Sequence, residues 1–383
     1  MNRQEKQSTF NLIPVFIAFF VMGFVDIVGV STSYVKNDFH LSDTLSNLLP
    51  MMVFIWFAIC SLPIGILMGH IGRRNMVLFS IALTIVSMLL PLLYYSFPMI
   101  LAAFMILGIS NTMLQVSLNP LLLGLVSPNK VTSMITLGNF VKAISSTLGP
   151  LIVSMAIGRF NNWHLIFWVY VLISVLSFIC LLFVKSDDSQ SLVEQKGVVN
   201  ILALLKSRKM ILIFSVILLS VGFEIGLMTS VPKYLVEHCA IDIAEASIGC
   251  SAYFIGRTLG TFLGSFLFNR FNAGKLMVGS VLGGILFFIL FLFLKDKIII
   301  MTLLFVIGLT CANIFPFVFS QGMQLNQEKA NEASALMIMG VAGGAILPIF
   351  MGMIADMSNQ RISLLLPLLS LIYIWIVLYK VKN

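Results

Sequence analysis

The sequence has few charged residues and long apolar runs. Only 10% of its 383 residues are Asp, Glu, Lys or Arg, whereas 59% are hydrophobic. A typical soluble domain carries about 25% charged residues. The mean hydropathy is +1.05, and apolar runs reach the roughly 20 residues that a helix needs to cross a bilayer. These properties exclude an ordinary soluble domain and indicate a polytopic protein embedded in the lipid bilayer.

Several motifs of catalysis and metal binding are also absent. The five cysteines are scattered, with no CxxC or metal-ligand spacing. The sequence contains no HExxH motif and no phosphate-binding P-loop. The polar start "MNRQEKQST" runs directly into a full-length span, so we predict no cleavable signal peptide. We therefore expect no enzyme activity, no cofactor and no metal, and we attribute the net charge of +8 to loops rather than to nucleic-acid binding.

The apolar runs predict twelve membrane-spanning helices. Their approximate ranges are 10–35, 45–69, 76–96, 98–125, 133–158, 162–184, 210–236, 244–268, 276–294, 297–323, 331–357 and 361–380. The long polar break predicts an N-terminal six-helix bundle at 1–184, a cytoplasmic linker at 185–209 and a C-terminal six-helix bundle at 210–383. The linker includes "VVNILALL", which could form a short amphipathic helix on the membrane surface.

The distribution of Lys and Arg predicts the orientation of the chain. Fifteen of these residues fall on the side of both termini and six on the other side. Basic loops collect on the cytoplasmic side of a membrane. We therefore expect both termini in the cytoplasm, and a multi-pass protein of a bacterial inner membrane.

The two halves of the chain repeat at an almost constant offset. Asp26 in "GFVDI" and Glu224 in "GFEIG" are 198 positions apart, and Pro120 and Pro316 are 196 apart. Two six-helix halves joined by a linker are typical of the major facilitator fold. The predicted fold class is thus an all-α membrane protein with twelve transmembrane helices in two pseudo-symmetric bundles.

Four charged side chains lie deep inside predicted spans: Asp26, Lys142, Glu224 and Arg257. A charge at mid-membrane depth costs about 3 kcal/mol on insertion scales, so each should face protein or a water-filled cavity. One interpretation is two structural ion pairs, one in each half. The other is functional: an acid in a site that opens alternately to each side could bind and release protons. In that case Asp26 is the proton carrier, and a nearby Lys142 keeps it ionised until the pair is disturbed.

Amides and aromatic rings near these charges are candidate ligands for a sugar. Gln115 and Asn119 are four positions apart and share a helix face, as do Asn139 and Lys142, three apart. Amides both donate and accept hydrogen bonds, as sugar hydroxyls require. The predicted substrate-binding residues are Gln115, Asn139, Lys142, Asn119, Tyr34, Glu224, Tyr253, Arg257 and Asn313. Interhelical hydrogen bonding remains the alternative for the amides, and it is favoured for Asn119, which precedes Pro120.

The sequence motifs of these spans resemble those of the fucose–proton symporter family within the major facilitator superfamily. The shared motifs run in order from the first span to the eleventh: "VDI", "LPIGILMGHIGRR", "LQVSLNP", "FIGRTLGTFL", "IFPFVFSQGM" and "GGAILPIFMGMIAD". The resemblance implies that Asp26 is the proton-linked aspartate. It also places Asn139 within one position of a sugar-contacting asparagine in the fifth span.

The chain departs from that family at two positions of the predicted site. Gln115 stands where the family has a second acid, and an amide cannot titrate. Lys142 adds a positive charge. These departures leave a neutral hexose as the leading substrate, and a sugar acid or other small organic anion bound by Lys142 as an alternative.

We therefore predict a secondary transporter that carries a monosaccharide together with a proton by alternating access. Sodium coupling, an anion or drug transporter on the same scaffold, and a membrane sensor that does not transport remain alternatives. We expect the protein to act as a monomer, with a small-molecule solute as its partner.

Overall fold

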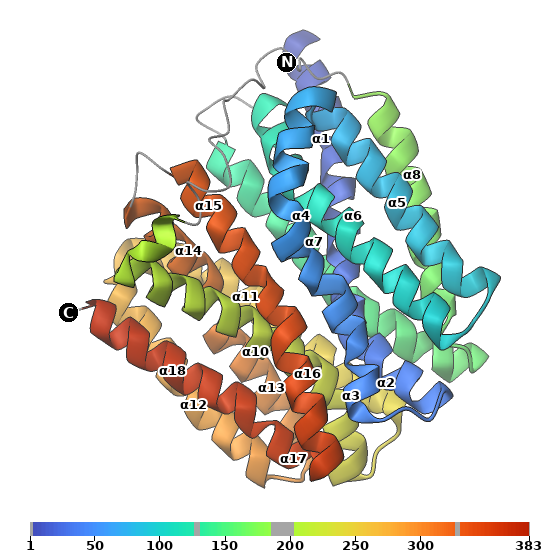
Figure 1. The fold of residues 1–383 in the computed structure, drawn as a ribbon, viewed down its shortest axis with the longest axis vertical. Helices are drawn as coiled ribbons and strands as arrows, with labels where there is room; N and C mark the ends of the chain where they lie inside the picture. The colour runs from blue at the N-terminus through green and yellow to red at the C-terminus, as the bar shows by residue number, and fades with distance from the viewer. Residues whose placement is uncertain (1–2, 126–130, 185–202, 326–329, 383) are drawn as a thin grey trace.

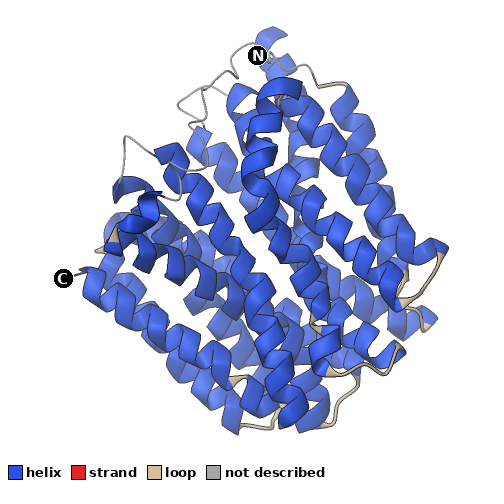
Figure 2. Ribbon diagram, viewed as in Figure 1, coloured by secondary structure: helices blue, strands red, loops and turns tan. Residues whose placement is uncertain are grey.

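The computed structural model describes residues 3–125, 131–184, 203–325 and 330–382, and in this part of the chain every regular element is a helix (Figure 2). The elements of the N-terminal half are α1 (Arg3–Met22), η1 (Gly23–Ile27), α2 (Val28–Asp38), α3 (Asp43–Ser46), α4 (Leu48–Ile71), α5 (Arg73–Leu93), α6 (Phe97–Leu125), α7 (Val131–Phe160) and α8 (Leu165–Leu182). Those of the C-terminal half are η4 (Ala203–Lys206), α10 (Arg208–Cys239), α11 (Ile243–Arg270), α12 (Ala273–Phe293), α13 (Lys297–Cys311), α14 (Ile314–Leu325), α15 (Ala330–Met339), η6 (Gly340–Ala342), α16 (Gly343–Met357), α17 (Gln360–Ser363) and α18 (Leu365–Lys382).

These helices confirm the predicted all-α membrane fold. Among the described residues, 11 helices are long and apolar enough to cross a membrane. The remaining predicted span, 244–268, coincides with α11, which has 28 residues but is less apolar and contains Glu245 and Arg257. The predicted linker falls mostly outside the described residues, where "VVNILALL" cannot be placed apart from its last residues in η4.

The spans alternate in direction and define two faces of the molecule. Because the number of crossings is even, α1 begins and α18 ends at one face, which we name the terminal face. The opposite face holds α2, α3 and α17, which lie together at the lower end of Figure 1, far from the N-terminus.

Three spans are interrupted near the middle of the molecule. The first changes from α-helix to a 3₁₀ segment at η1, the eleventh changes in the same way at η6, and the tenth breaks between α13 and α14. Pro316 explains the last break, because it lacks the N–H that would bond the carbonyl of Ala312 in a continuous helix. A 3₁₀ stretch inside a long helix often marks a functional hinge, and all three interruptions contribute residues to the central cavity.

Glycine residues allow neighbouring helices to approach closely in the C-terminal half. A Cβ atom on Gly256 of α11 would lie 1.9 Å from the carbonyl oxygen of Phe305 on α13. A Cβ atom on Gly308 of α13 would lie 2.1 Å from the carbonyl oxygen of Tyr253 on α11. Such contact of small residues replaces the hydrophobic effect as the basis of helix association in lipid. It fixes the part of α11 that carries Arg257.

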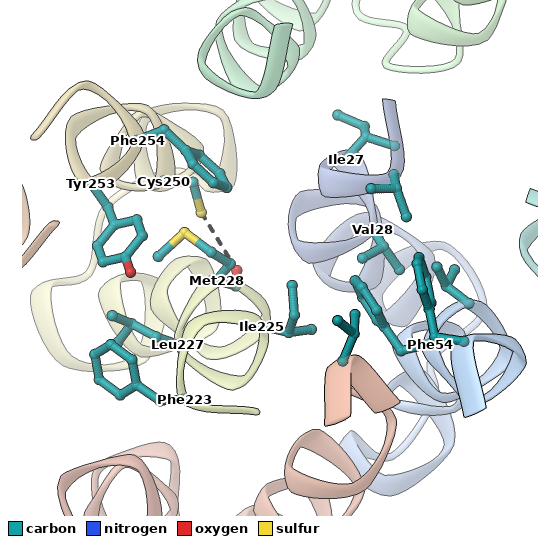
Figure 3. Packing of buried hydrophobic residues seen from close by; sticks show 14 of the residues in the cluster. Ile27, Val28, Phe54, Phe223, Ile225, Leu227, Met228, Cys250, Tyr253 and Phe254 are labelled. Atoms are coloured by element: carbon teal, nitrogen blue, oxygen red, sulfur yellow. Dashed lines mark hydrogen bonds between the residues drawn. The ribbon is translucent and has the colours of Figure 1, made fainter. Parts of the chain in front are cut away.

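An apolar layer joins the two halves on the side of the cavity nearer the opposite face. In Figure 3, Val28 and Phe54 of the N-terminal half lie on the side that faces Ile225 of α10. Met228 of α10 packs against Gly29 of α2, where a Cβ atom would lie 2.8 Å from Met228 Cβ. The side chains of Val28, Phe54, Ile225 and Met228 are all buried. Among the described residues, the lining of the central cavity includes Phe54 and Ile225 but no residue of α2 or α3, so this layer lies between the cavity and the opposite face.

Candidate substrate cavity and proton site

A cavity of about 1350 Å³ lies between the two halves. Its lining includes Asp26, Gln115 and Lys142 from the N-terminal half, and Glu224 and Arg257 from the C-terminal half. Further lining residues come from the parts of α6, α7, α11 and α14 that run toward the terminal face: Asn119, Leu137, Phe262 and Ser320. The cavity thus extends from mid-depth toward the terminal face.

Asp26 lies in the cavity wall at the interruption of the first span. Its side chain accepts a hydrogen bond from the hydroxyl of Ser146 on α7, and the residue is 9% exposed. In a 3₁₀ helix, residues three apart lie on the same face, so Gly23 also faces α7. A Cβ atom on Gly23 would lie 2.6 Å from Ser145 Cβ and 2.7 Å from the Lys142 carbonyl oxygen. The glycine therefore lets η1 approach α7 and brings Asp26 within reach of Ser146.

The four charged residues that lie deep inside the predicted spans all line this cavity. Arg257 forms an ion pair with Glu224 through Nη1 and Oε1, which joins α11 to α10. Lys142 is half-buried and interacts electrostatically with Asp26, Glu224 and Arg257. Among the ion pairs within 4 Å that the described residues form, none contains Lys142 or Asp26. The two predicted pairs therefore differ. Glu224 and Arg257 form an ion pair, whereas the Asp26 carboxylate and the Lys142 amine are more than 4 Å apart.

The amide of Gln115 belongs to a chain of hydrogen bonds that leads to the hinge at η1. Gln115 Nε2 donates to Asn111 Oδ1 over 2.9 Å, and Asn111 Nδ2 donates to the Met22 carbonyl oxygen over 2.9 Å. Asn111 is 2% exposed, and Gln115 lines the cavity. Gln115 is thus held by a buried amide and presents the rest of its hydrogen-bonding capacity to the cavity.

Of the other predicted ligands, three line the cavity and two do not. Asn119, Asn139 and Tyr253 line the cavity with the residues above. Tyr34 does not: its hydroxyl lies 3.1 Å from Ser247 Oγ, and its ring stacks on Trp163 at 5.4 Å. Asn313 also lies outside the lining and donates to the Gly260 carbonyl oxygen over 2.8 Å. Tyr34 and Asn313 therefore join helices; for Asn313 this is the interhelical bonding that is the alternative for the amides.

Sequence reasoning missed several lining residues and their supports. Ser146 follows Lys142 by four positions and Asn111 precedes Gln115 by four, so helical spacing could have identified both. Aromatic rings also line the cavity, among them Phe54, Phe140, Phe223, Phe315 and Phe319. Nothing in the sequence separates these phenylalanines from the many that face lipid.

Charged residues cross-link the two halves at the opposite face. Asp43 of α3 binds Lys36 of α2 (Oδ2–Nζ 2.6 Å) and Lys233 of α10 (Oδ1–Nζ 3.1 Å). Lys233 Nζ also donates to Ser46 Oγ over 2.9 Å and to Asn47 Oδ1 over 3.1 Å. Only 5% of the Lys233 side chain is exposed. We name Lys36, Asp43, Ser46, Asn47, Lys233 and Asp356 the opposite-face cluster.

Asp356 of α16 completes this cluster from the C-terminal half. Its two carboxylate oxygens accept from the backbone N–H groups of Asp43 at 2.5 Å and Thr44 at 2.7 Å. These are unsatisfied donors at the start of a helical segment, where a carboxylate is favoured. Asn47 Nδ2 donates to the Pro348 carbonyl oxygen over 2.6 Å, and a Cβ atom on Gly352 would lie 2.7 Å from the Asp43 carbonyl oxygen. The cluster therefore holds α3 against α16 and α10.

Within the described residues, no group of three or more His, Cys, Asp or Glu side chains could hold a metal ion. The site lies between two helical bundles. It consists of the Asp26 carboxyl group, the Lys142 amine, the ion pair of Glu224 and Arg257, and several amides and aromatic rings. An interrupted helix with a buried charge at mid-depth is the usual form of a substrate or ion site in a secondary transporter.

Comparisons with known proteins agree with this class. The family model of the Major Facilitator Superfamily matches residues 15–348, so the chain belongs to that superfamily. The "Glucose/galactose transporter" of Brucella abortus is 24% identical over 390 residues, which cover 97% of this chain and 93% of the relative.

Solved structures show the same fold. The fucose:proton symporter FucP of E. coli superposes with a TM-score of 0.69 at 16% identity, covering 96% of this chain and 98% of the symporter. The nucleoside transporter NupG superposes with a TM-score of 0.77 at 16% identity, with full coverage of both chains. The predicted resemblance is confirmed at the level of superfamily and fold. The protein is thus a multi-pass membrane transport protein and not an enzyme.

Proposed function

We propose that the protein is a secondary active transporter that moves a monosaccharide together with a proton by alternating access. The proposal places it in a bacterial inner membrane, with the terminal face in the cytoplasm because most Lys and Arg residues lie there. The cavity then extends toward the cytoplasm, and the opposite-face cluster closes the outer side. A structure with the cavity extending toward the cytoplasm and the outer side closed is in the inward-facing state.

The observation that carries the proposal is the position of Asp26. A carboxyl group at mid-depth lies in the cavity wall, on an interrupted helix, with Ser146 as its hydrogen-bond donor. It forms no ion pair within 4 Å among the described residues. A carboxyl group that faces a water-filled cavity in a membrane is a typical proton relay. Asp26 is therefore the proposed proton carrier.

The chemistry of the cavity suits a sugar. Gln115, Asn119 and Asn139 supply amide groups, and Tyr253 and the phenylalanines supply ring surface. Binding sites for small molecules combine apolar walls with a few placed polar groups. The Brucella relative is named for glucose and galactose, and one structural neighbour for fucose and a proton. We therefore propose a hexose as the substrate.

The test is uptake of radiolabelled glucose, galactose and fucose into proteoliposomes with an inward proton gradient. The unmodified protein should accumulate at least one of them, and the Asp26→Asn variant should retain exchange of internal for external sugar but lose accumulation. Loss of about tenfold in the accumulation ratio corresponds to about 1.4 kcal/mol of lost coupling. Full accumulation by Asp26→Asn would refute the role of Asp26. A sodium gradient in place of the proton gradient separates the two coupling ions.

A second substrate class rests on Lys142. Its amine lies at the cavity without an ion-pair partner within 4 Å among the described residues, so it could bind the carboxylate of a sugar acid. Hexuronates and small organic acids should then compete with hexose uptake in the unmodified protein. If Lys142→Ala leaves the uptake of every tested acid unchanged, this candidate is excluded.

A further inference from the structure

We infer that Asn111 is a positioning residue that links occupancy of Gln115 to the conformation of η1, and thus couples sugar binding to the proton site at Asp26. This inference rests on the proposed function. Asn111 belongs to none of the residues predicted from the sequence, and it lies behind the cavity wall rather than in it. Its role follows from the two hydrogen bonds of its amide.

The first bond acts on the helix that carries Asp26. In a regular α-helix the carbonyl of Met22 accepts the N–H of the residue four positions later, which is Asp26 itself. The η1 segment replaces that pattern with bonds three residues apart. Asn111 Nδ2 supplies a donor to the Met22 carbonyl at 2.9 Å. A buried carbonyl with a good side-chain donor no longer needs its α-helical partner, so Asn111 stabilises η1 in the 3₁₀ form.

The second bond extends this influence to the cavity. Gln115 Nε2 donates to the same amide, at Asn111 Oδ1, over 2.9 Å. Both residues lie on α6 four positions apart, so their side chains share one face of the helix. This bond sets which way the Asn111 amide points: its oxygen faces Gln115, and its nitrogen faces Met22.

Substrate binding can change this arrangement in one step. A sugar hydroxyl that bonds the second N–H or the carbonyl oxygen of the Gln115 amide draws this amide toward the cavity and away from Asn111 Oδ1. Asn111 then loses the contact that orients it, and its bond to Met22 weakens. The hinge becomes free to return to α-helical bonding, which rotates Asp26 relative to Ser146. Two states of η1 thus differ in their contacts at both the sugar site and the proton site, as thermodynamic coupling between two sites requires.

The experiment compares Asn111→Leu, which keeps the branched shape of the side chain and removes both hydrogen bonds, with Thr112→Val as the control. Thr112 is buried beside Asn111 on α6, and its hydroxyl donates within its own helix, to the Gly108 carbonyl. Both variants and the unmodified protein are assayed for sugar exchange without a gradient and for accumulation driven by a proton gradient. We name the connection from Gln115 through Asn111 to the Met22 carbonyl the relay. It predicts that Asn111→Leu keeps exchange within about twofold and loses at least about fivefold in accumulation, the low end of typical coupling effects. Thr112→Val should keep both.

The outcomes separate the relay from the proposed function. If the unmodified protein shows no gradient-driven accumulation, the proposed function fails and the relay with it. If the unmodified protein accumulates sugar and Asn111→Leu does so equally well, the relay alone is overturned. Equal loss of exchange and accumulation in folded Asn111→Leu would indicate a purely structural role and would also overturn it.

A measurement on the unmodified protein keeps the inference testable if the variant does not fold. Hydrogen–deuterium exchange of the segment 20–30, with and without a transported sugar, reports directly on the backbone bonding of η1. The relay predicts a change in exchange protection there on sugar addition. Unchanged protection at saturating sugar would overturn the relay.

Discussion

Replacing Lys233 with Met should shift the transporter toward its outward-facing state. The Lys233 amine comes from the C-terminal half and contacts Asp43, Ser46 and Asn47 of the N-terminal half at 2.9–3.1 Å. Opening of the opposite face must break all of these contacts, so they stabilise only the inward-facing state. The variant therefore removes stabilisation from one state of the equilibrium and not from the other.

The magnitude follows from the burial of the pair. Breaking a buried ion pair by removing one partner costs about 3–5 kcal/mol. The low end applies here, because Asp43 keeps Lys36 at 2.6 Å after the substitution. A loss of about 3 kcal/mol raises the ratio of outward-facing to inward-facing molecules about a hundredfold. Such a shift changes the majority state if the unmodified protein favours the inward-facing state by less than that amount.

Lys36→Met is the matched control. Lys36 binds the same carboxylate, but from the same half of the molecule, so this contact moves as a unit when the halves separate. The assay is the distance distribution between spin labels at exposed positions 162 and 295, which lie at the opposite face on different halves. The distance should lengthen in Lys233→Met and stay unchanged in Lys36→Met. Equal behaviour of the two variants, or no lengthening in Lys233→Met, would refute the assignment of this cluster as the outer gate.

Three further predictions concern the hinge, the helix packing and the charge that is moved. Gly23→Ala places a Cβ atom 2.6 Å from Ser145 Cβ, so η1 must move away from α7, and proton-driven uptake should fall about tenfold, as for a step that loses about 1.4 kcal/mol. Gly256→Ala puts a Cβ atom 1.9 Å from the Phe305 carbonyl oxygen and should lower stability by about 1–3 kcal/mol, seen as a lower Tm in detergent. Gly279→Ala, with no atom within 4 Å of its Cβ, should not lower the Tm. Finally, a neutral sugar carried with one proton moves one positive charge, so an inside-negative potential of 100 mV should add about 2.3 kcal/mol to accumulation; a monoanion carried with one proton would show no such dependence.

The sequence predicted the fold because the bilayer restricts what an apolar chain can do. Backbone groups in lipid must bond within their own segment, so each apolar run of sufficient length is a helix. The twelve predicted spans coincide with helices. The repeat relates Asp26 to Glu224 at an offset of 198 residues, and both side chains line the cavity. A charge deep in a span has few stable surroundings in a membrane, and this restriction made the charged residues predictable.

Tertiary structure alone decided which partner each polar residue has. Lys142 and Arg257 are similarly placed in the sequence, each deep in a span of the half that also contains a deep acid. Among the described residues Arg257 forms an ion pair with Glu224, whereas Lys142 forms none with Asp26. Asn111 lies behind the wall and Gln115 in it, and Asn313 bonds a neighbouring helix although it seemed equally suited to a ligand. The opposite-face cluster joins Asp43 to Lys233 and Asp356, nearly 200 and more than 300 residues away. Helical periodicity assigns a residue to a face of its own helix, but the rotation and contact of that face against other helices depend on close packing at positions such as Gly23 and Gly256, which only the assembled molecule determines.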